Sequence, residues 1–339
     1  MYVSTGGPYR NNYNPYDLGI WDERRQIRSA ASGVCWTALL GILLMILVLP
    51  LAFKAYLSSL GFVFTQQDSF GGIPPAIYYL VLAVDYILGL ALPAFLYFFI
   101  KHIPLSEGLP FHHAGAMDVT LYVAIGCMVC MLANYPASWV SVIQEHFGFS
   151  GTLPSMPLTN SPLVIFLYAV NVVIVPPLVE EIMFRGVVLQ SMRRFGDGFA
   201  ILFSSILFGL YHGNFIQMVF AFFCGLAMSF AVVRTNSLLP SILIHFINNS
   251  ISLAVEMTER FKGQAMANYV DHIASFALIA AGLIAIGILF SRHKLFSGRR
   301  AAGPLLPLSL RMGAAFGNFG AVSFILYGFL SSVFTLYHA

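Results

Sequence analysis

The chain has 339 residues, of which 58% are hydrophobic and 9% are charged, and its formal net charge is +3. Soluble globular domains carry about a quarter charged residues, so the composition excludes a soluble domain and a disordered chain. It is typical of a polytopic membrane protein. The small positive charge gives no indication of nucleic-acid binding, because it reflects an uneven distribution of Lys and Arg between the two sides of the membrane.

Residues 1–30 are rich in Tyr, Asn, Gly and Pro and then change to the charged run Asp22-Glu23-Arg24-Arg25. We predict a cytoplasmic N-terminal tail here, which either ends in a short interfacial helix or is an unstructured leader throughout. About 30 polar residues precede the first apolar run, where a cleavable signal peptide would place its hydrophobic region. No such signal is therefore expected.

Apolar runs follow, and most are long enough to cross the ~30 Å core of a bilayer as helices. They lie near residues 33–54, 75–100, 118–142, 161–190, 199–213, 215–233, 238–257, 271–291 and 313–337. The run at 199–213 is short, so its far end should lie inside the membrane or in a local cavity. The predicted fold is all-α, a polytopic transmembrane helical bundle of eight or nine spans. Residues 31–292 form its core, and residues 293–339 form a basic loop and a final transmembrane helix.

The positions of Lys and Arg predict the orientation of this bundle. With a cytoplasmic N-terminus, Lys54, Arg260 and Lys262 fall outside, and the rest of the 17 Lys and Arg residues fall inside. This bias predicts a multi-pass protein, in the cell (plasma) membrane, with its N-terminus in the cytoplasm.

Residues 171–249 hold ionisable and polar side chains at membrane depth, where such groups are costly and usually functional. Glu180 lies 16 residues before the turn at Gly196, and His212 lies 16 residues after it. An antiparallel helical hairpin places the two at the same height, and His245 and Asn249 on a later helix reach a comparable level. Burying four polar groups singly in lipid is worse than clustering them, so we expect a cluster.

The spacing of the two carboxylates separates their roles. Glu181 and Arg185 are four residues apart and are expected to form an ion pair on one face of the helix. Glu180 points about 100° away and is left as a general base. Alternatively, it is a second acceptor for Arg185 or a hydrogen-bonding group between helices. Pro176-Pro177 should loosen this helix and open a cavity beside the carboxylates.

His245 and Asn249 share a helical face, and both can donate hydrogen bonds to an oxyanion. Asn248 lies off that face. The alternative for His245 and Asn249 is that they hold helices together, and the alternative for His212 is a core histidine.

Three motifs on successive helices resemble those of the CPBP intramembrane proteases, which include CAAX prenyl endopeptidases and bacteriocin-associated membrane proteases. They read Glu180-Glu181-Ile182-Met183-Phe184-Arg185, Phe208-Gly209-Leu210-Tyr211-His212 and His245-Phe246-Ile247-Asn248-Asn249. The resemblance implies that Glu180 and His212 activate a water molecule and that His245 and Asn249 stabilise the tetrahedral oxyanion. Glu181, Arg185 and Phe208 would support the site.

The family has been described both as glutamate-dependent and as metal-dependent. We favour a metal-free glutamate mechanism. The alternative cofactor is zinc, with Glu180, His212 and His245 as ligands and a fourth position for water.

The expected function is an intramembrane endopeptidase that hydrolyses a peptide bond of a membrane-associated or lipidated protein or peptide. The expected partners are that substrate and the lipid bilayer, and no nucleic acid is expected. Two other classes stay open. One is a proton-coupled membrane transporter, in which Asp85, Glu180 and His212 form a relay. The other is a non-catalytic immunity scaffold. The sequence does not specify a groove for a prenyl chain.

Overall fold

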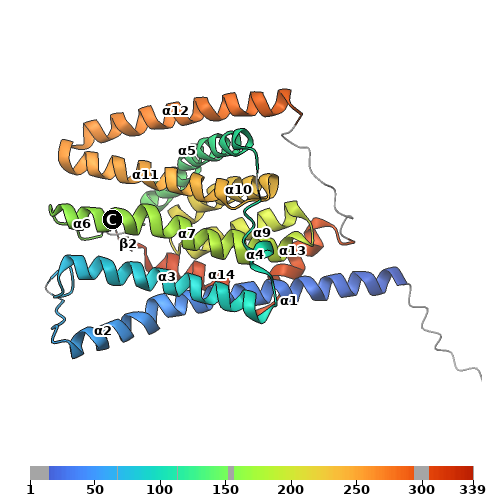
Figure 1. The fold of residues 1–339 in the computed structure, drawn as a ribbon, viewed down its shortest axis with the longest axis horizontal. Helices are drawn as coiled ribbons and strands as arrows, with labels where there is room; N and C mark the ends of the chain where they lie inside the picture. The colour runs from blue at the N-terminus through green and yellow to red at the C-terminus, as the bar shows by residue number, and fades with distance from the viewer. Residues whose placement is uncertain (1–14, 67, 113, 152–155, 294–304, 339) are drawn as a thin grey trace, which may run out of the picture.

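The computed structural model describes residues 15–66, 68–112, 114–151, 156–293 and 305–338. They form a helical bundle with almost no strand (Figure 1), which confirms the predicted all-α class. The small sheet pairs β1 (Phe149–Ser150) with β2 (Tyr337–His338) in antiparallel register. It joins the loop after α5 to the end of the described chain.

Several of the long helices contain short π-helical stretches, written η. The elements in chain order are α1 (Pro15–Leu43), η1 (Leu44–Val48), α2 (Leu49–Ser59), α3 (Pro75–Ile100), α4 (Leu105–Gly108), α5 (Ala116–His146), α6 (Pro162–Ala169), η2 (Val170–Ile174), α7 (Val175–Glu181), η3 (Ile182–Leu189), α8 (Gln190–Arg193), α9 (Asp197–Tyr211), α10 (Phe215–Thr235), α11 (Leu239–Lys262), α12 (Gln264–Ser291), α13 (Leu308–Phe316) and α14 (Phe319–Phe334). The stretch from α6 to α8 is one continuous helix over Pro162–Arg193.

The number of membrane-crossing helices is lower than the sequence suggested. In the described ranges, six helices are long and apolar enough to cross a membrane, or seven if the bent pair α13–α14 counts as one span. Helix α9 has 15 residues, as short as predicted. Helix α11 is not among the six, because polar residues such as His245, Asn248 and Asn249 interrupt its apolar run. The predicted count of eight or nine spans is therefore approximate.

The final span expected over residues 313–337 is broken. Helices α13 and α14 meet at an angle of 79°. At the break, the side chain of Asn318 accepts a hydrogen bond from the backbone N–H of Ala321 at 3.0 Å, so Asn318 starts a new helix as its N-cap. In the sequence, the pair Gly317-Asn318 marks this break. It was not recognised there, because the residues on both sides form one apolar run.

The first described helix begins well before the first apolar run. Helix α1 is already formed at Pro15 and continues to Leu43, so the boundary placed at residue 30 falls inside a helix. The first 14 residues of the expected tail lie outside the described part of the chain.

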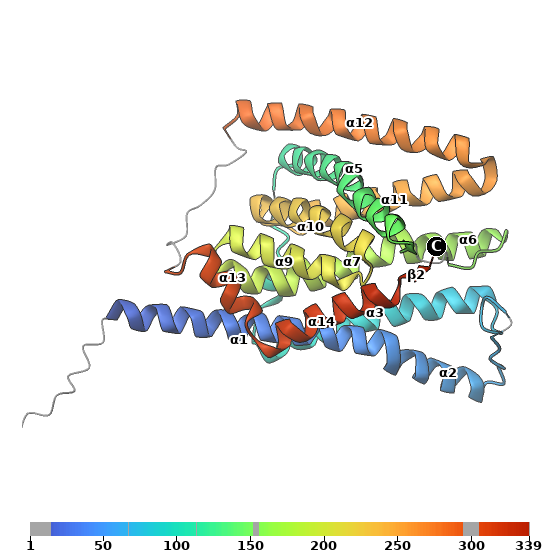
Figure 2. The ribbon, with the colours of Figure 1, turned by 180° about the vertical axis from the view of Figure 1, so that it is seen from behind.

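The helices that carry the three motifs lie at the centre of the bundle. Figures 1 and 2 show α12 at one edge, with α5 and α11 beside it, and α1 at the opposite edge next to α3. Helices α7, α9 and α10 lie between these edges. Buried aromatic residues such as Phe184, Phe203 and Phe208 fill the core around them. The polar residues of the motifs are thus enclosed by protein and kept away from lipid, which membrane-embedded polar groups require.

Helices α1 and α3 approach each other closely at two glycines. A Cβ atom at Gly41 would lie 2.8 Å from the carbonyl oxygen of Gly89, and one at Gly89 would lie 2.1 Å from Cγ of Met45. Small residues permit such close backbone contact between helices in membranes.

We expect Gly41→Ala to lower the thermal unfolding temperature, because the added methyl group meets a backbone oxygen and overpacking typically costs about 1–3 kcal/mol. Gly287→Ala on α12 is the matched control, since its Cβ would have no heavy atom within 4 Å. Scanning fluorimetry of the purified variants in detergent measures both. Equal unfolding temperatures for the two variants would contradict the close contact between α1 and α3.

Candidate active site

The helix that carries the carboxylates is reshaped by Pro176 and Pro177. Prolines lack a backbone N–H, so the Val172 carbonyl has no donor four or five residues later in the helix. The side-chain amide of Asn249 takes that place and donates to the Val172 oxygen at 2.9 Å. The π-helical stretches η2 and η3 flank α7 on both sides, in agreement with the loosening expected from the two prolines. Single π-helical turns are frequent at functional sites.

Glu181 is the centre of a buried charge cluster. Its Oε1 accepts from Arg185 Nη1 at 2.9 Å and lies 3.1 Å from His245 Nδ1, and both Glu181 and Arg185 are fully buried. The expected ion pair between Glu181 and Arg185 is therefore present. The contact with His245 was not predicted. It fixes the imidazole ring, because a carboxylate can only accept the Nδ1 proton.

The ring of Phe208 lies between the charged groups. The Arg185 guanidinium carbon is 4.2 Å from its centroid, a distance at which a cation is attracted to an aromatic face. The same ring packs against His212 and His245, with centroids 4.9 and 6.0 Å away. Phe208 therefore sets the spacing of the two histidines, which gives its place in the second motif a physical reason.

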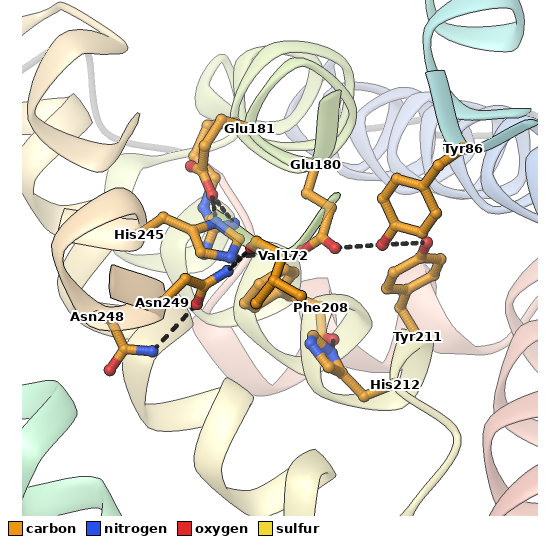
Figure 3. Close-up of polar contacts among 11 residues, drawn as sticks. Tyr86, Val172, Glu180, Glu181, Phe208, Tyr211, His212, His245, Asn248 and Asn249 are labelled. Atoms are coloured by element: carbon orange, nitrogen blue, oxygen red, sulfur yellow. Dashed lines mark hydrogen bonds and ion pairs between the residues drawn. The ribbon is translucent and has the colours of Figure 1, made fainter. Parts of the chain in front are cut away.

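Glu180 has one oxygen held and one oxygen free. The hydroxyl of Tyr86 donates to Glu180 Oε1, and the hydroxyl of Tyr211 donates to that of Tyr86 at 3.1 Å (Figure 3). Glu180 Oε2 is buried without a hydrogen-bond partner among the described residues, and it lies 3.8 Å from His245 Nε2. One of the alternatives left open by the sequence, a hydrogen bond from Glu180 to a neighbouring helix, thus holds for one of its two oxygens.

His212 stands at the break between α9 and α10. The chain turns at Gly213, whose φ is 57°, and Asn214 caps α10 by accepting from the backbone N–H groups of Ile216 and Gln217. His212 Nδ1 lies 2.8 Å from the Phe208 carbonyl oxygen. Since a carbonyl can only accept, the proton is on Nδ1 and Nε2 is left as an acceptor.

A cavity of about 60 Å³ lies between these helices, and its lining includes His212, His245, Asn248 and Asn249. A volume of this size admits a few water molecules but no peptide segment. Glu180 is not among the lining residues. Its Oε2 nevertheless lies 3.8 Å from Nε2 of His245, which does line the cavity (Figure 3). The structure therefore brings His212, His245 and Asn249 to one hollow, with Glu180 next to it.

Three further side chains of the site were not identified from the sequence. Tyr86 lies in α3 beside Asp85, which had drawn attention only through its charge, and Tyr211 lies inside the second motif. Asn248 was placed off the useful face, but it is buried, lines the cavity and donates to Asn249 Oδ1 at 3.3 Å. Uncharged Tyr and Asn residues give no distinctive sequence signal, so packing alone reveals them.

The residues named for zinc do not form a ligand set in this arrangement. Throughout the described ranges, no group of three or more His, Cys, Asp or Glu side chains is placed to hold a metal ion. We therefore derive no catalytic step through a metal.

Comparison with known proteins supports the resemblance seen in the three motifs. Residues 162–251 match the model of the family described as Type II CAAX prenyl endopeptidase Rce1-like, and this segment contains all three motifs. No curated protein and no solved structure matches the chain. The members of the matched family are CAAX-type intramembrane proteases, which are membrane hydrolases acting on a peptide or protein.

The buried cluster should matter more for stability than an exposed pair of the same spacing. We expect Glu181→Gln to lower the free energy of unfolding by about 3–5 kcal/mol, since it leaves Arg185 buried without a counter-charge. Asp197→Asn is the matched control, because Asp197 pairs with Arg193 at 3.0 Å in the same i, i+4 arrangement but is 45% exposed. Its loss should cost at most about 1 kcal/mol.

Unfolding of both variants by titration with a denaturing detergent, followed by circular dichroism, measures this difference. Similar losses for the two substitutions would show that the Glu181 cluster is not a structural anchor.

Proposed function

We propose that this protein is an intramembrane endopeptidase in which Glu180 and His212 activate the attacking water molecule. The observation that carries the proposal is a pair of acceptors: Glu180 Oε2 has no hydrogen-bond partner among the described residues, and His212, which uses Nδ1 on the Phe208 carbonyl, has Nε2 left as an acceptor. Fixed bases of this kind suit general base catalysis. Because residues 162–251 match a family of endopeptidases, we propose a peptide bond as the target of the activated water.

In the proposed step, the water oxygen attacks the carbonyl carbon of the scissile peptide while one water proton passes to Glu180 Oε2. His212 Nε2 accepts a hydrogen bond from the other O–H of the water and orients it; that hydrogen stays on the oxygen. When the C–N bond breaks, the proton held by Glu180 moves to the leaving amine. The products are a carboxylic acid and an amine, and Glu180 returns to its ionised form.

His245 and Asn249 are proposed to stabilise the oxyanion. The amide nitrogen of Asn249 has two N–H bonds and uses one of them on Val172, so the second remains for the substrate. His245 donates from Nε2 only when both ring nitrogens carry protons. Glu181 already balances Arg185, so the carboxylate that balances this second positive charge is Glu180, whose Oε2 lies 3.8 Å from His245 Nε2. Donors that are already fixed before the reaction are the most effective in such a role.

The proposed substrate is a membrane-associated or lipid-modified protein. An apolar groove of about 370 Å³ runs between η2 and α11, where Val173, Phe246 and Ser250 line it. Each of these residues is within three positions of Val172 or Asn249, which are joined by a hydrogen bond, and Asn249 also lines the catalytic cavity. We further propose the orientation drawn from Lys and Arg, with a cytoplasmic N-terminus in the plasma membrane.

A proton relay through Asp85 finds no support in the hydrogen bonds. The chain of hydroxyl groups runs from Tyr211 through Tyr86 to Glu180. In the described part of the protein, Oδ1 of Asp85 has no hydrogen-bond partner. The endopeptidase therefore remains the function that we propose.

We expect Glu180→Gln and His212→Ala each to reduce kcat by about 100- to 10,000-fold, the usual contribution of general acid–base catalysis. Glu256→Gln is the matched control and should keep full activity. Glu256 also accepts from a tyrosine hydroxyl, that of Tyr168 at 2.6 Å, but lies in a different cluster of the bundle.

The assay is mass spectrometry of peptides incubated with the protein in proteoliposomes, with and without a metal chelator. The probes are a farnesylated CAAX peptide, its unprenylated counterpart and a pool of membrane peptides. Wild-type cleavage rates in both Glu180→Gln and His212→Ala would refute the mechanism. Full biological activity of Glu180→Gln would indicate a non-catalytic scaffold, and solute flux without hydrolysis would indicate a transporter.

We expect Tyr86→Phe to lower kcat by about 10- to 100-fold, as for the loss of a hydrogen bond to a charged group worth about 1.5–3 kcal/mol. KM should change little, because Tyr86 holds Glu180 and has no predicted contact with the substrate. Tyr168→Phe removes the equivalent hydroxyl from Glu256 and serves as the control. Steady-state kinetics on the cleaved peptide separates kcat from KM, and equal rates for the two variants would show that Tyr86 does not position the base.

A further inference from the structure

A polar hollow of about 460 Å³ lies at the end of the bundle where α3 and α8 terminate. Its lining combines two cations, Lys101 and Arg194, with the side chains of Tyr97, Gln190 and Ser191. The residues that line the catalytic cavity are different ones, so this hollow is a separate site.

The polar groups of the hollow are arranged to receive an anion. The hydroxyl groups of Tyr97 and Ser191 lie 3.1 Å apart and are hydrogen-bonded, and the side chain of Tyr97 is buried. Lys101 and Arg194 are exposed and form no ion pair with a carboxylate in the described ranges. Their charges are therefore available to a ligand.

The positive charge extends along α1. A neighbouring hollow of about 590 Å³ is lined by Arg24, Arg25 and Arg28 and shares Ser29 with the first. Among the described residues that line the two hollows, the carboxylate present is that of Glu107. The electrostatic balance of this surface thus strongly favours an anion.

An apolar groove continues from the polar hollow. It measures about 500 Å³, and Phe98 and Ile103 line both the groove and the hollow. Phe99 in the groove is 77% exposed and belongs to the last turn of α3, which is long and apolar enough to cross a membrane. A ligand that fits both parts needs an anionic group joined to a hydrocarbon chain.

We propose that this surface binds an anionic phospholipid of the surrounding bilayer. Lys101 and Arg194 contact the phosphate with the help of the Tyr97 and Ser191 hydroxyl groups, and an acyl chain follows the groove along α3. The apolar run of α3 ends at Ile100, so Lys101 stands at headgroup level, where basic pockets between transmembrane helices bind such lipids. Free phosphate would leave the groove unused, and a prenyl chain alone would leave the cations unused.

The test is native mass spectrometry of the full chain, with phosphatidylglycerol and phosphatidylcholine of identical acyl chains as probes. We expect preferential retention of phosphatidylglycerol by the wild-type protein. Lys101→Gln and Arg194→Gln should each weaken phosphatidylglycerol binding about fivefold, which corresponds to about 1 kcal/mol per cation. Arg194→Lys keeps the positive charge and should bind phosphatidylglycerol as the wild-type protein does. Arg292→Gln is the matched control, since Arg292 caps α12 at the opposite edge of the bundle (Figures 1 and 2) and should have no effect.

Three results would overturn the proposal. One is equal retention of the two lipids, and another is an equal effect of Lys101→Gln and Arg292→Gln. The third is displacement of the lipid by inorganic phosphate or by the farnesylated peptide at the same concentration as phosphatidylglycerol. Displacement by inorganic phosphate would indicate a simple anion site. Displacement by the farnesylated peptide would indicate a site for the lipid tail of the substrate. Thermal unfolding of each variant without added lipid shows that the fold is kept, and the measurement does not depend on the proposed peptidase activity.

Discussion

A single buried carboxylate, that of Glu181, holds the centre of this membrane bundle together. It bridges Arg185 on its own helix and His245 on α11, and an unbalanced charge at that depth would be prohibitively costly. The need to balance it fixes how α7, η3 and α11 pack. The ring of Phe208 covers the guanidinium of Arg185 and brings α9 into the same arrangement. The polar residues beside the cavity are therefore positioned by a contact that lies outside the reacting atoms of the proposed step.

Pro176 and Pro177 create the second constraint. They deprive the Val172 carbonyl of any donor within its helix, and Asn249 on α11 supplies the missing hydrogen bond. A defect in one helix thereby becomes a link between two helices. It also explains why an amide, able to donate twice, stands at position 249: one N–H satisfies the backbone and leaves the other for the site.

The sequence predicted the parts of the site that depend on charge and period. The i, i+4 spacing of Glu181 and Arg185 was enough to predict their ion pair, and residue counts from Gly196 placed Glu180 and His212 on paired helices. It could not predict Tyr86 or Tyr211, because phenol groups in apolar helices usually serve packing. The burial of Asn248 was not predicted, since a helical wheel drawn for a single helix ignores the neighbouring helices α5 and α10. The span count was approximate for a related reason. Composition does not indicate the angle between successive helical segments, so the bend at Asn318 could not be recognised within an apolar run.

The small volume of the cavity beside His212 and His245 bears on the selectivity of the proposed peptidase. A chamber that admits solvent but no polypeptide keeps the proposed bases away from neighbouring membrane proteins, which surround such an enzyme at high local concentration. In the proposed mechanism, a substrate spends part of its binding free energy on moving the helices around the cavity apart. Its apparent affinity is then reduced in proportion to the small population of the open state. Selection among substrates then depends on the free energy needed to open the cavity as much as on the fit of side chains around the scissile bond.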